Sequence, residues 1–113
     1  MPKVTVGLTE EITIFGAKKP RKVVARIDTG AGQSSIDTDL ATKMNLGPII
    51  SAKVIRSSHG TTLRAVVRAE IKFGRKRIRA KFNISDRRHM RYKMLLGVNI
   101  LRRLGVVIDP SRK

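Results

Sequence analysis

Residues 23–31 read Val23-Val24-Ala25-Arg26-Ile27-Asp28-Thr29-Gly30-Ala31, and this stretch decides the fold. Its apolar, β-branched first half predicts a strand, which holds the backbone rigid up to Asp28. A small turn then exposes the Asp28 carboxylate, while the Thr29 hydroxyl can lock the turn and Gly30 permits close backbone approach. Taken alone, Asp-Thr-Gly is better explained as an ordinary Asx turn at a strand end, so a catalytic interpretation depends on the rest of the chain.

The surrounding segments predict a mostly β chain. From Leu63 to Phe73 the apolar residues Ala65, Val67, Ala69, Ile71 and Phe73 alternate with Arg64, Val66, Arg68, Glu70 and Lys72. After a tight connection at Gly74-Arg75-Lys76 the alternation resumes as far as Phe82. This pattern predicts a hairpin with Phe73 and Phe82 facing the core and a basic outer face. Further strands are expected at 4–7, 12–15, 23–27, 49–55, 78–84 and 106–108, and short helices at 39–45 (capped by Asp37 or Thr38) and 99–104 (ended by Gly105). The prediction is a small closed or folded-over sheet and not a parallel α/β fold.

Size and charge narrow the class of protein. The chain has 113 residues, so we expect a single domain spanning 1–113. Its 25 Lys and Arg against 8 Asp and Glu give a net charge of +17, which suits a nucleic-acid partner, an acidic protein partner or a heavily solvated surface. No apolar run approaches the roughly 20 residues of a membrane span, the charged N-terminus does not resemble a secretory signal, and there is no cysteine. The expectation is a cytoplasmic protein without membrane contact.

A second motif near the C-terminus changes the interpretation of Asp28-Thr29-Gly30-Ala31. Met94-Leu95-Leu96-Gly97 is followed by a predicted short helix and a last strand. The order of strand, Asp-Thr-Gly-Ala, hairpin, apolar-apolar-Gly, helix and strand resembles that of the retropepsins, the single-domain dimeric aspartic proteases. The resemblance covers nearly the whole chain.

Five ordered blocks resemble one prokaryotic family more closely. They are Ala25–Ala31, Ile55–Gly60, Asp86–Met90, Met94–Gly97 and Val107–Ser111. This retropepsin-like aspartic peptidase family is associated with the glutamate ligase RimK and is often labelled as ATP-dependent zinc proteases. The resemblance implies an all-β, retropepsin-like closed barrel with one active-site half per subunit, and proteolysis. For some members it also implies removal of glutamate residues that the ligase added to a ribosomal protein.

The chain departs from the family pattern at three positions. Val98 stands where the family and the viral retropepsins usually have Arg, and Gly32 stands where the viral enzymes have the acid that pairs with it. Both members of that pair are missing together, so neither is left as an unpaired buried charge. Lys93 replaces a Pro that often precedes the Met-Leu-Leu-Gly block.

Peptide hydrolysis by carboxylates requires two of them about one water molecule apart, sharing a proton. The chain has one Asp-Thr-Gly, so the hypothesis requires a homodimer in which Asp28 of each subunit completes the site and Thr29 bonds across the twofold axis. Residues 56–62 are expected to form a flap over a peptide or protein substrate. The residues expected to close over or hold an acidic substrate are Arg56, Ser57, Ser58, His59, Gly60, Arg64, Arg88 and Arg91.

Neither a metal nor another cofactor is expected. The chain has two histidines, no cysteine, no H-E-x-x-H and no phosphate-binding G-x-x-x-x-G-K-[ST] loop; Asp86 and His89 are the nearest approach to a metal-binding pair. Two alternatives stay open. One is a basic nucleic-acid- or ribosome-associated binding module on a peptidase-like fold, and the other is an inactive peptidase-like fold used for dimerisation or peptide binding.

Overall fold

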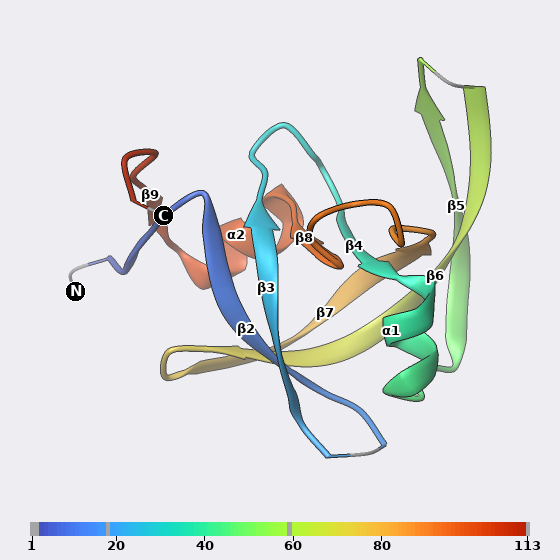
Figure 1. The fold of residues 1–113 in the computed structure, drawn as a ribbon, viewed down its shortest axis with the longest axis horizontal. Helices are drawn as coiled ribbons and strands as arrows, with labels where there is room; N and C mark the ends of the chain where they lie inside the picture. The colour runs from blue at the N-terminus through green and yellow to red at the C-terminus, as the bar shows by residue number, and fades with distance from the viewer. Residues whose placement is uncertain (1–2, 18, 59, 113) are drawn as a thin grey trace.

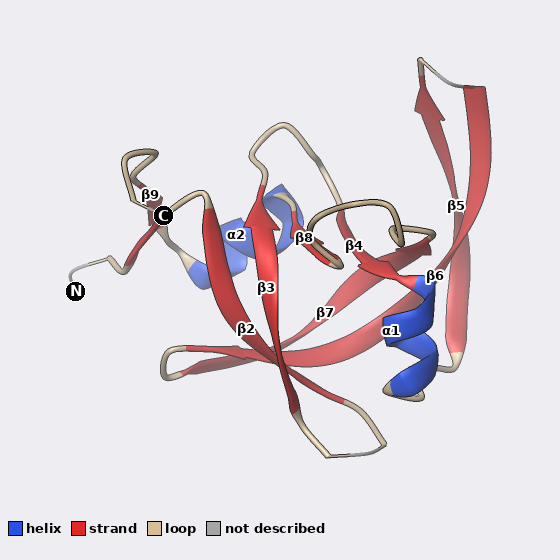
Figure 2. Cartoon of the chain, viewed as in Figure 1, coloured by secondary structure: helices blue, strands red, loops and turns tan. Residues whose placement is uncertain are grey.

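The computed structural model describes residues 3–17, 19–58 and 60–112. Most of the chain is strand, and two short helices complete it (Figure 2). The elements in chain order are β1 (Thr5–Val6), β2 (Thr9–Phe15), β3 (Arg21–Ile27), β4 (Ser34–Asp37), α1 (Thr38–Lys43), β5 (Ile49–Ser57), β6 (Gly60–Phe73), β7 (Lys76–Ser85), β8 (Met94–Leu96), α2 (Val98–Leu104) and β9 (Val107–Ile108).

Six of the strands form a closed barrel. Their order is β2-β3-β8-β4-β7-β6, and the barrel closes where β2 pairs with β6 through Thr13↔Lys72, Ile14↔Ile71 and Phe15↔Glu70. Strand β5 pairs with β6 alone, so the β5–β6 hairpin extends away from the barrel (Figure 1). The predicted small closed sheet is confirmed.

The alternating pattern of β6 and β7 places one face in the core and the other in solvent. Val67, Ile71 and Phe82 are completely buried, and Phe73 packs against the same core. The intervening residues of both strands are mostly basic and exposed, among them Arg68, Lys72, Arg79 and Lys81. Burial of the apolar face stabilises the hairpin, so much of the net charge is the solvent side of one sheet.

Both predicted helices are present, with small shifts of their ends. Asp37 caps α1 by accepting a bond from the backbone N–H of Asp39 at 3.2 Å, and the helix ends at Lys43. Gly105 ends α2 with φ of 65°, the left-handed conformation that favours glycine. The two helices lie against β4, β7 and β8.

Strand β4 was not among the predicted strands, because its sequence, Ser34-Ser35-Ile36-Asp37, is mostly polar. All four residues are nevertheless buried between β7 and β8. The hydroxyl of Ser34 donates to Oδ1 of Asn99 at 2.7 Å, and that of Ser35 donates to Oδ1 of Asn83 at 2.8 Å. Burial of these hydroxyls is tolerated because each has a partner.

The two ends of the chain meet outside the barrel. Strands β1 and β9 pair in parallel through Thr5↔Val107 and Val6↔Ile108, and form a separate two-stranded sheet. Gly7 makes this possible, since a Cβ there would lie 2.7 Å from the carbonyl oxygen of Arg112. In the described ranges, neither helix has the length and apolar character that crossing a membrane requires.

Candidate active site

The turn after β3 holds the carboxylate of Asp28 in a defined position. β3 runs parallel to β8, and the Asp28 backbone N–H extends this ladder by donating to the Leu96 carbonyl at 3.0 Å. The Gly30 N–H donates to Oδ1 of Asp28 at 2.9 Å, and the Ala31 N–H donates to the Asp28 carbonyl at 3.3 Å. Asp28 is half-buried, whereas Thr29 and Gly30 are exposed. The carboxylate is therefore oriented by the Gly30 N–H in a turn at the end of β3.

Gly97 explains why the second motif has its glycine. The turn 31–33 presses against it so closely that a Cβ on Gly97 would lie 2.2 Å from the carbonyl oxygen of Gln33 and 2.7 Å from that of Ala31. The Gly97 N–H donates to the buried Ser34 hydroxyl at 2.9 Å, and the Val98 N–H donates to the Ala31 carbonyl at 2.8 Å. The start of α2 thus braces the Asp28 turn through backbone contact.

The backbone contact between α2 and the Asp28 turn lies where the acid–arginine pair of the viral enzymes is missing. Val98 reaches the turn through its backbone N–H, while a Cβ on Gly32 would meet nothing within 4 Å. The turn is consequently held in this chain without a charge pair at these two positions.

The hairpin β5–β6 contains the segment predicted as a flap. Its strands pair as far as Arg56↔Thr61 and Ser57↔Gly60, and Gly60 has φ of 116° at the tip. Figure 1 shows the hairpin standing clear of the barrel. Val54 and Leu63, a cross-strand pair, are 52% and 71% exposed, so one apolar pair of the hairpin faces solvent. His59 lies outside the described residues.

A cavity of about 360 Å³ adjoins the Asp28 turn. Its lining includes two residues of the turn and two lysines from β5 and β7. The lining residues are Gly32, Gln33, Ser51, Lys53, Val66, Lys81, Phe82, Asn83 and Asn99. Nη1 of Arg64 donates to Oδ1 of Asn83 at 3.4 Å, and Nδ2 of Asn83 donates to Oε1 of Gln33 at 3.5 Å. The hairpin, β7 and the turn are joined by this polar chain. The cavity therefore presents ammonium groups and side-chain amides as hydrogen-bonding groups.

Of the four arginines expected to hold substrate, Arg64 reaches this cavity lining. Arg88 instead pairs with Asp86, its Nε 3.0 Å from Oδ2. Arg91 lies over the ring of Tyr92 at 5.6 Å from the centroid, and Arg56 is exposed near the hairpin tip.

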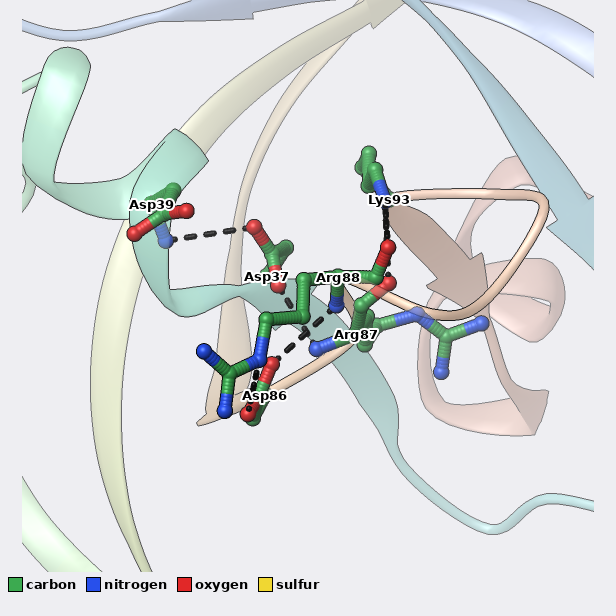
Figure 3. A network of polar contacts seen from close by, with 6 residues as sticks. All are labelled: Asp37, Asp39, Asp86, Arg87, Arg88 and Lys93. Atoms are coloured by element: carbon green, nitrogen blue, oxygen red, sulfur yellow. Dashed lines mark hydrogen bonds and ion pairs between the residues drawn. The ribbon is translucent and has the colours of Figure 1, made fainter.

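Arg87, which sequence reasoning did not single out, lies within electrostatic reach of Asp28. It is 8% exposed, and its backbone N–H donates to Oδ1 of Asp37 at 2.6 Å (Figure 3). Its Nε donates to the carbonyl of Tyr92 at 2.9 Å. Burial lowers the pKa of Arg87, and the charge of Arg64 lowers it further, against the opposing effects of Asp37 and Asp28. The sequence has three arginines within 86–91, and no local pattern in it indicates which of them is buried.

Lys93 holds the loop in which Arg87 lies. Its ammonium donates to the backbone carbonyls of Arg87 and Arg88 at 3.1 and 2.9 Å (Figure 3). It also donates to the carbonyl of Met90 at 3.3 Å. A lysine at the position where the family often has Pro thus organises the loop by hydrogen bonding.

No three histidine, aspartate or glutamate side chains come together as ligands for a metal ion within 3–17, 19–58 and 60–112. Asp86, half of the nearest pair in the sequence, is bonded to the Arg88 guanidinium. The donor set in the described chain therefore does not fit a zinc site.

Comparison with solved structures shows the same fold in viral and bacterial proteins. The EIAV protease, solved with the inhibitor HBY-793, is 22% identical with a TM-score of 0.71 over 89% of this chain and 90% of that one. Lpg0085 from Legionella pneumophila, described as a DUF785 protein of unknown function, is 21% identical with a TM-score of 0.70 over 99% and 97%. The simian foamy virus protease is 21% identical with a TM-score of 0.62 over 85% and 93%. The retropepsin-like fold is therefore confirmed.

Comparison with protein-family models shows to which family the chain belongs. A search of curated sequences finds no match. The model of the RimB-like family, described as retropepsin-like aspartic endopeptidase RimB, matches residues 36–113, which is more than two thirds of the chain and includes the 86–90 and 94–97 blocks. The chain belongs to the RimB-like family of retropepsin-like aspartic endopeptidases.

Proposed function

We propose that the protein is a homodimeric aspartic endopeptidase in which Asp28 and its symmetry mate activate water. The observation that carries this proposal is the Asp28 turn, whose carboxylate is oriented by the Gly30 N–H at 2.9 Å and braced by Gly97. The chain has one Asp-Thr-Gly, so residues 1–113 would act as a single domain that supplies half of the site. A cytoplasmic location is part of the proposal, supported by the absence of cysteine.

The dyad would work by passing protons between two carboxyl groups that share one. Two carboxylates this close cannot both stay ionised, so one accepts a proton from water while the other donates its proton to the peptide carbonyl oxygen. The water oxygen bonds to the carbonyl carbon and gives a tetrahedral intermediate. The newly protonated carboxyl group then protonates the amide nitrogen while the other carboxylate takes a hydroxyl proton, so the C–N bond breaks and the dyad returns to one shared proton. Thr29, exposed beside Asp28, is proposed to bond to the partner's turn across the twofold axis.

The terminal sheet supports dimerisation. β1 and β9 lie outside the barrel, and three apolar side chains in or beside these strands are exposed. Val107 on β9 is 47% exposed, and Val4 and Leu8, which flank β1, are 58% and 50% exposed. A two-stranded sheet also leaves unpaired edges, which favour pairing with another chain. We propose that this sheet and the Asp28 turns form the subunit interface.

We propose acidic or glutamate-rich polypeptides as the substrates. Lys53 and Lys81 line the cavity beside the turn, and Arg64 bonds to Asn83 in its lining. Arg87 and Asp28 are close enough for the carboxylate to affect the pKa of the guanidinium. An acidic side chain bound in this cavity would be attracted by Lys53, Lys81 and Arg64, none of which forms an ion pair in the described residues.

The test is cleavage of a glutamate-rich peptide and its glutamine-rich counterpart by wild type, Asp28→Asn and Asp39→Asn. Asp39 is an exposed acid on α1, so its variant controls for the loss of one negative charge. Asp28→Asn is expected to lose about 10²- to 10⁴-fold in kcat/KM, as general acid–base groups contribute, while Asp39→Asn stays close to wild type. Unchanged cleavage by Asp28→Asn would sink the mechanism. Equal kcat/KM for the two peptides would contradict the substrate class only.

A further inference from the structure

A groove on the outer wall of the barrel is lined by basic and amide side chains over a buried alanine. It lies where β6, β7 and α2 meet, and has a volume of about 290 Å³. Its lining consists of Arg68, Arg79, Ala80, Lys81, Asn99 and Arg103, with no carboxylate among these residues. All four cations are exposed, so an anion from solvent can reach each of them.

Hydrogen bonds to the β7 backbone fix the groove. Nη1 of Arg103 donates to the carbonyl of Arg79 at 2.5 Å, and Nδ2 of Asn99 donates to the carbonyl of Lys81 at 3.2 Å. On the sheet side, Arg68 lies directly opposite Lys81 in the β6–β7 register. Like charges placed opposite each other destabilise a strand pair, so this arrangement carries a cost that a bound anion would remove.

The groove cations form no ion pair with an acidic side chain in the described residues, although the charge of Arg79 contributes to lowering the pKa of Glu70. Glu70 lies opposite Arg79 in the register, but its carboxylate is bonded to Arg77 at both oxygens, at 2.7 and 3.0 Å. Arg77 in turn lies over the ring of Phe15, 3.9 Å from its centroid. In the part of the chain that the structure describes, the ion pairs engage Lys22, Arg77 and Arg88 and none of the groove cations.

We propose that this groove binds the phosphate backbone of duplex nucleic acid. Guanidinium forks match phosphate oxygens, and Arg79 and Lys81 project from one face of β7 about 7 Å apart. Protein interfaces have an apolar, aromatic-rich centre, whereas the apolar residue in this lining is the buried Ala80. The lining has no aromatic ring on which bases could stack, so contact with the backbone of a duplex is favoured over contact with single strands.

The experiment measures binding of a short RNA duplex, and of a DNA duplex of the same sequence, to the full chain by fluorescence anisotropy over a salt series. The test variant is Arg68→Gln/Arg79→Gln/Arg103→Gln. Because each of these arginines would neutralise one phosphate, the slope of log K against log salt becomes shallower by about 2.7, and affinity falls by about 100-fold near 0.15 M salt. Circular dichroism checks folding. The double variant Arg68→Gln/Arg79→Gln, which leaves the Arg103 bond to the Arg79 carbonyl in place, is expected to lose about 1.8 in slope.

The matched control removes three exposed cations elsewhere, in Arg21→Gln/Lys22→Gln/Lys43→Gln. It lowers the net charge by the same amount, and we expect it to keep most of the affinity. Equal weakening in the two triple variants would overturn the proposal, since binding would then follow net charge alone. Absence of duplex binding by wild type would overturn it too. Poly-glutamate is measured with the same variants, and its binding must not replace that of the duplexes: if the groove substitutions weaken binding of poly-glutamate but of neither duplex, the proposal is also overturned. None of these outcomes depends on peptidase activity.

Discussion

Gly97 lies against the carbonyl of Gln33 so closely that a β-carbon on Gly97 would be 2.2 Å from the Gln33 oxygen. We therefore expect Gly97→Ala to push the Asp28 turn and α2 apart and to lower the free energy of unfolding by about 3 kcal/mol. Gly32→Ala is the control, because a Cβ there meets nothing within 4 Å, and it should change stability by less than about 1 kcal/mol. Urea unfolding of both variants measures the difference. Similar stabilities of the two variants would show that the close contact with Gln33 is not the reason why glycine is needed at position 97.

This contact illustrates what could and could not be predicted from the sequence. The hairpin from Leu63 to Phe82 follows from its alternation, and the two helices follow from apolar spacing with Asp37 and Gly105 at their ends. The glycine of Met94-Leu95-Leu96-Gly97 was recognised as part of a motif. Its physical role appears only when two segments are brought together, as in the Gly97–Ser34 bond between residues 63 apart in the sequence.

The parts that sequence did not predict depend on such long-range partners. β4 is polar in sequence and becomes a buried strand because Ser34 and Ser35 bond to Asn99 and Asn83. Arg87 is buried, while Arg88 beside it pairs with Asp86 in solvent. No local pattern distinguishes those two arginines, because which one turns inward depends on the position of Tyr92 and Asp37.

Asp37 is expected to hold the 86–93 loop against α1. It is 3% exposed and accepts the backbone N–H of Arg87 at 2.6 Å and that of Asp39 at 3.2 Å (Figure 3). Asp37→Asn replaces one acceptor oxygen by a donor that faces a donor, so it should lower the free energy of unfolding by about 2 kcal/mol. Asp39→Asn, at an exposed position of the same helix, should lose less than about 0.5 kcal/mol. Chemical denaturation distinguishes them, and equal losses would mean that the Asp37 bonds add nothing beyond helix charge.

The ion pair of Glu70 with Arg77 should make the stability of the fold depend on pH in the acidic range. Hydrogen bonding to Arg77 lowers the pKa of Glu70 below its ordinary value of 4.5, and the charge of Arg77 acts in the same direction. Because the folded pKa is the lower one, the contribution is complete above the unfolded value and is lost as pH falls through the folded value. The melting temperatures of wild type and Glu70→Gln should therefore differ near neutral pH, and the difference should shrink progressively as pH falls below 4.5. A gap that stays constant down to pH 3 would contradict this assignment.

Val107 tests the interface proposed for the terminal sheet. It is 47% exposed on β9, whereas Val24, 45% exposed on the barrel strand β3, offers the same residue type at matched exposure. In a twofold dimer built on β1 and β9, Val107→Lys would place a charge in the interface of both subunits, and each chain already carries +17. We expect its dimer dissociation constant to rise at least about tenfold, equivalent to about 1.4 kcal/mol, with little change for Val24→Lys. Sedimentation velocity over a concentration series measures this.

Peptidase activity should fall in proportion to the dimer fraction, since one chain supplies one Asp28. A Val107→Lys protein that remains as dimeric as Val24→Lys would place the interface elsewhere on the barrel.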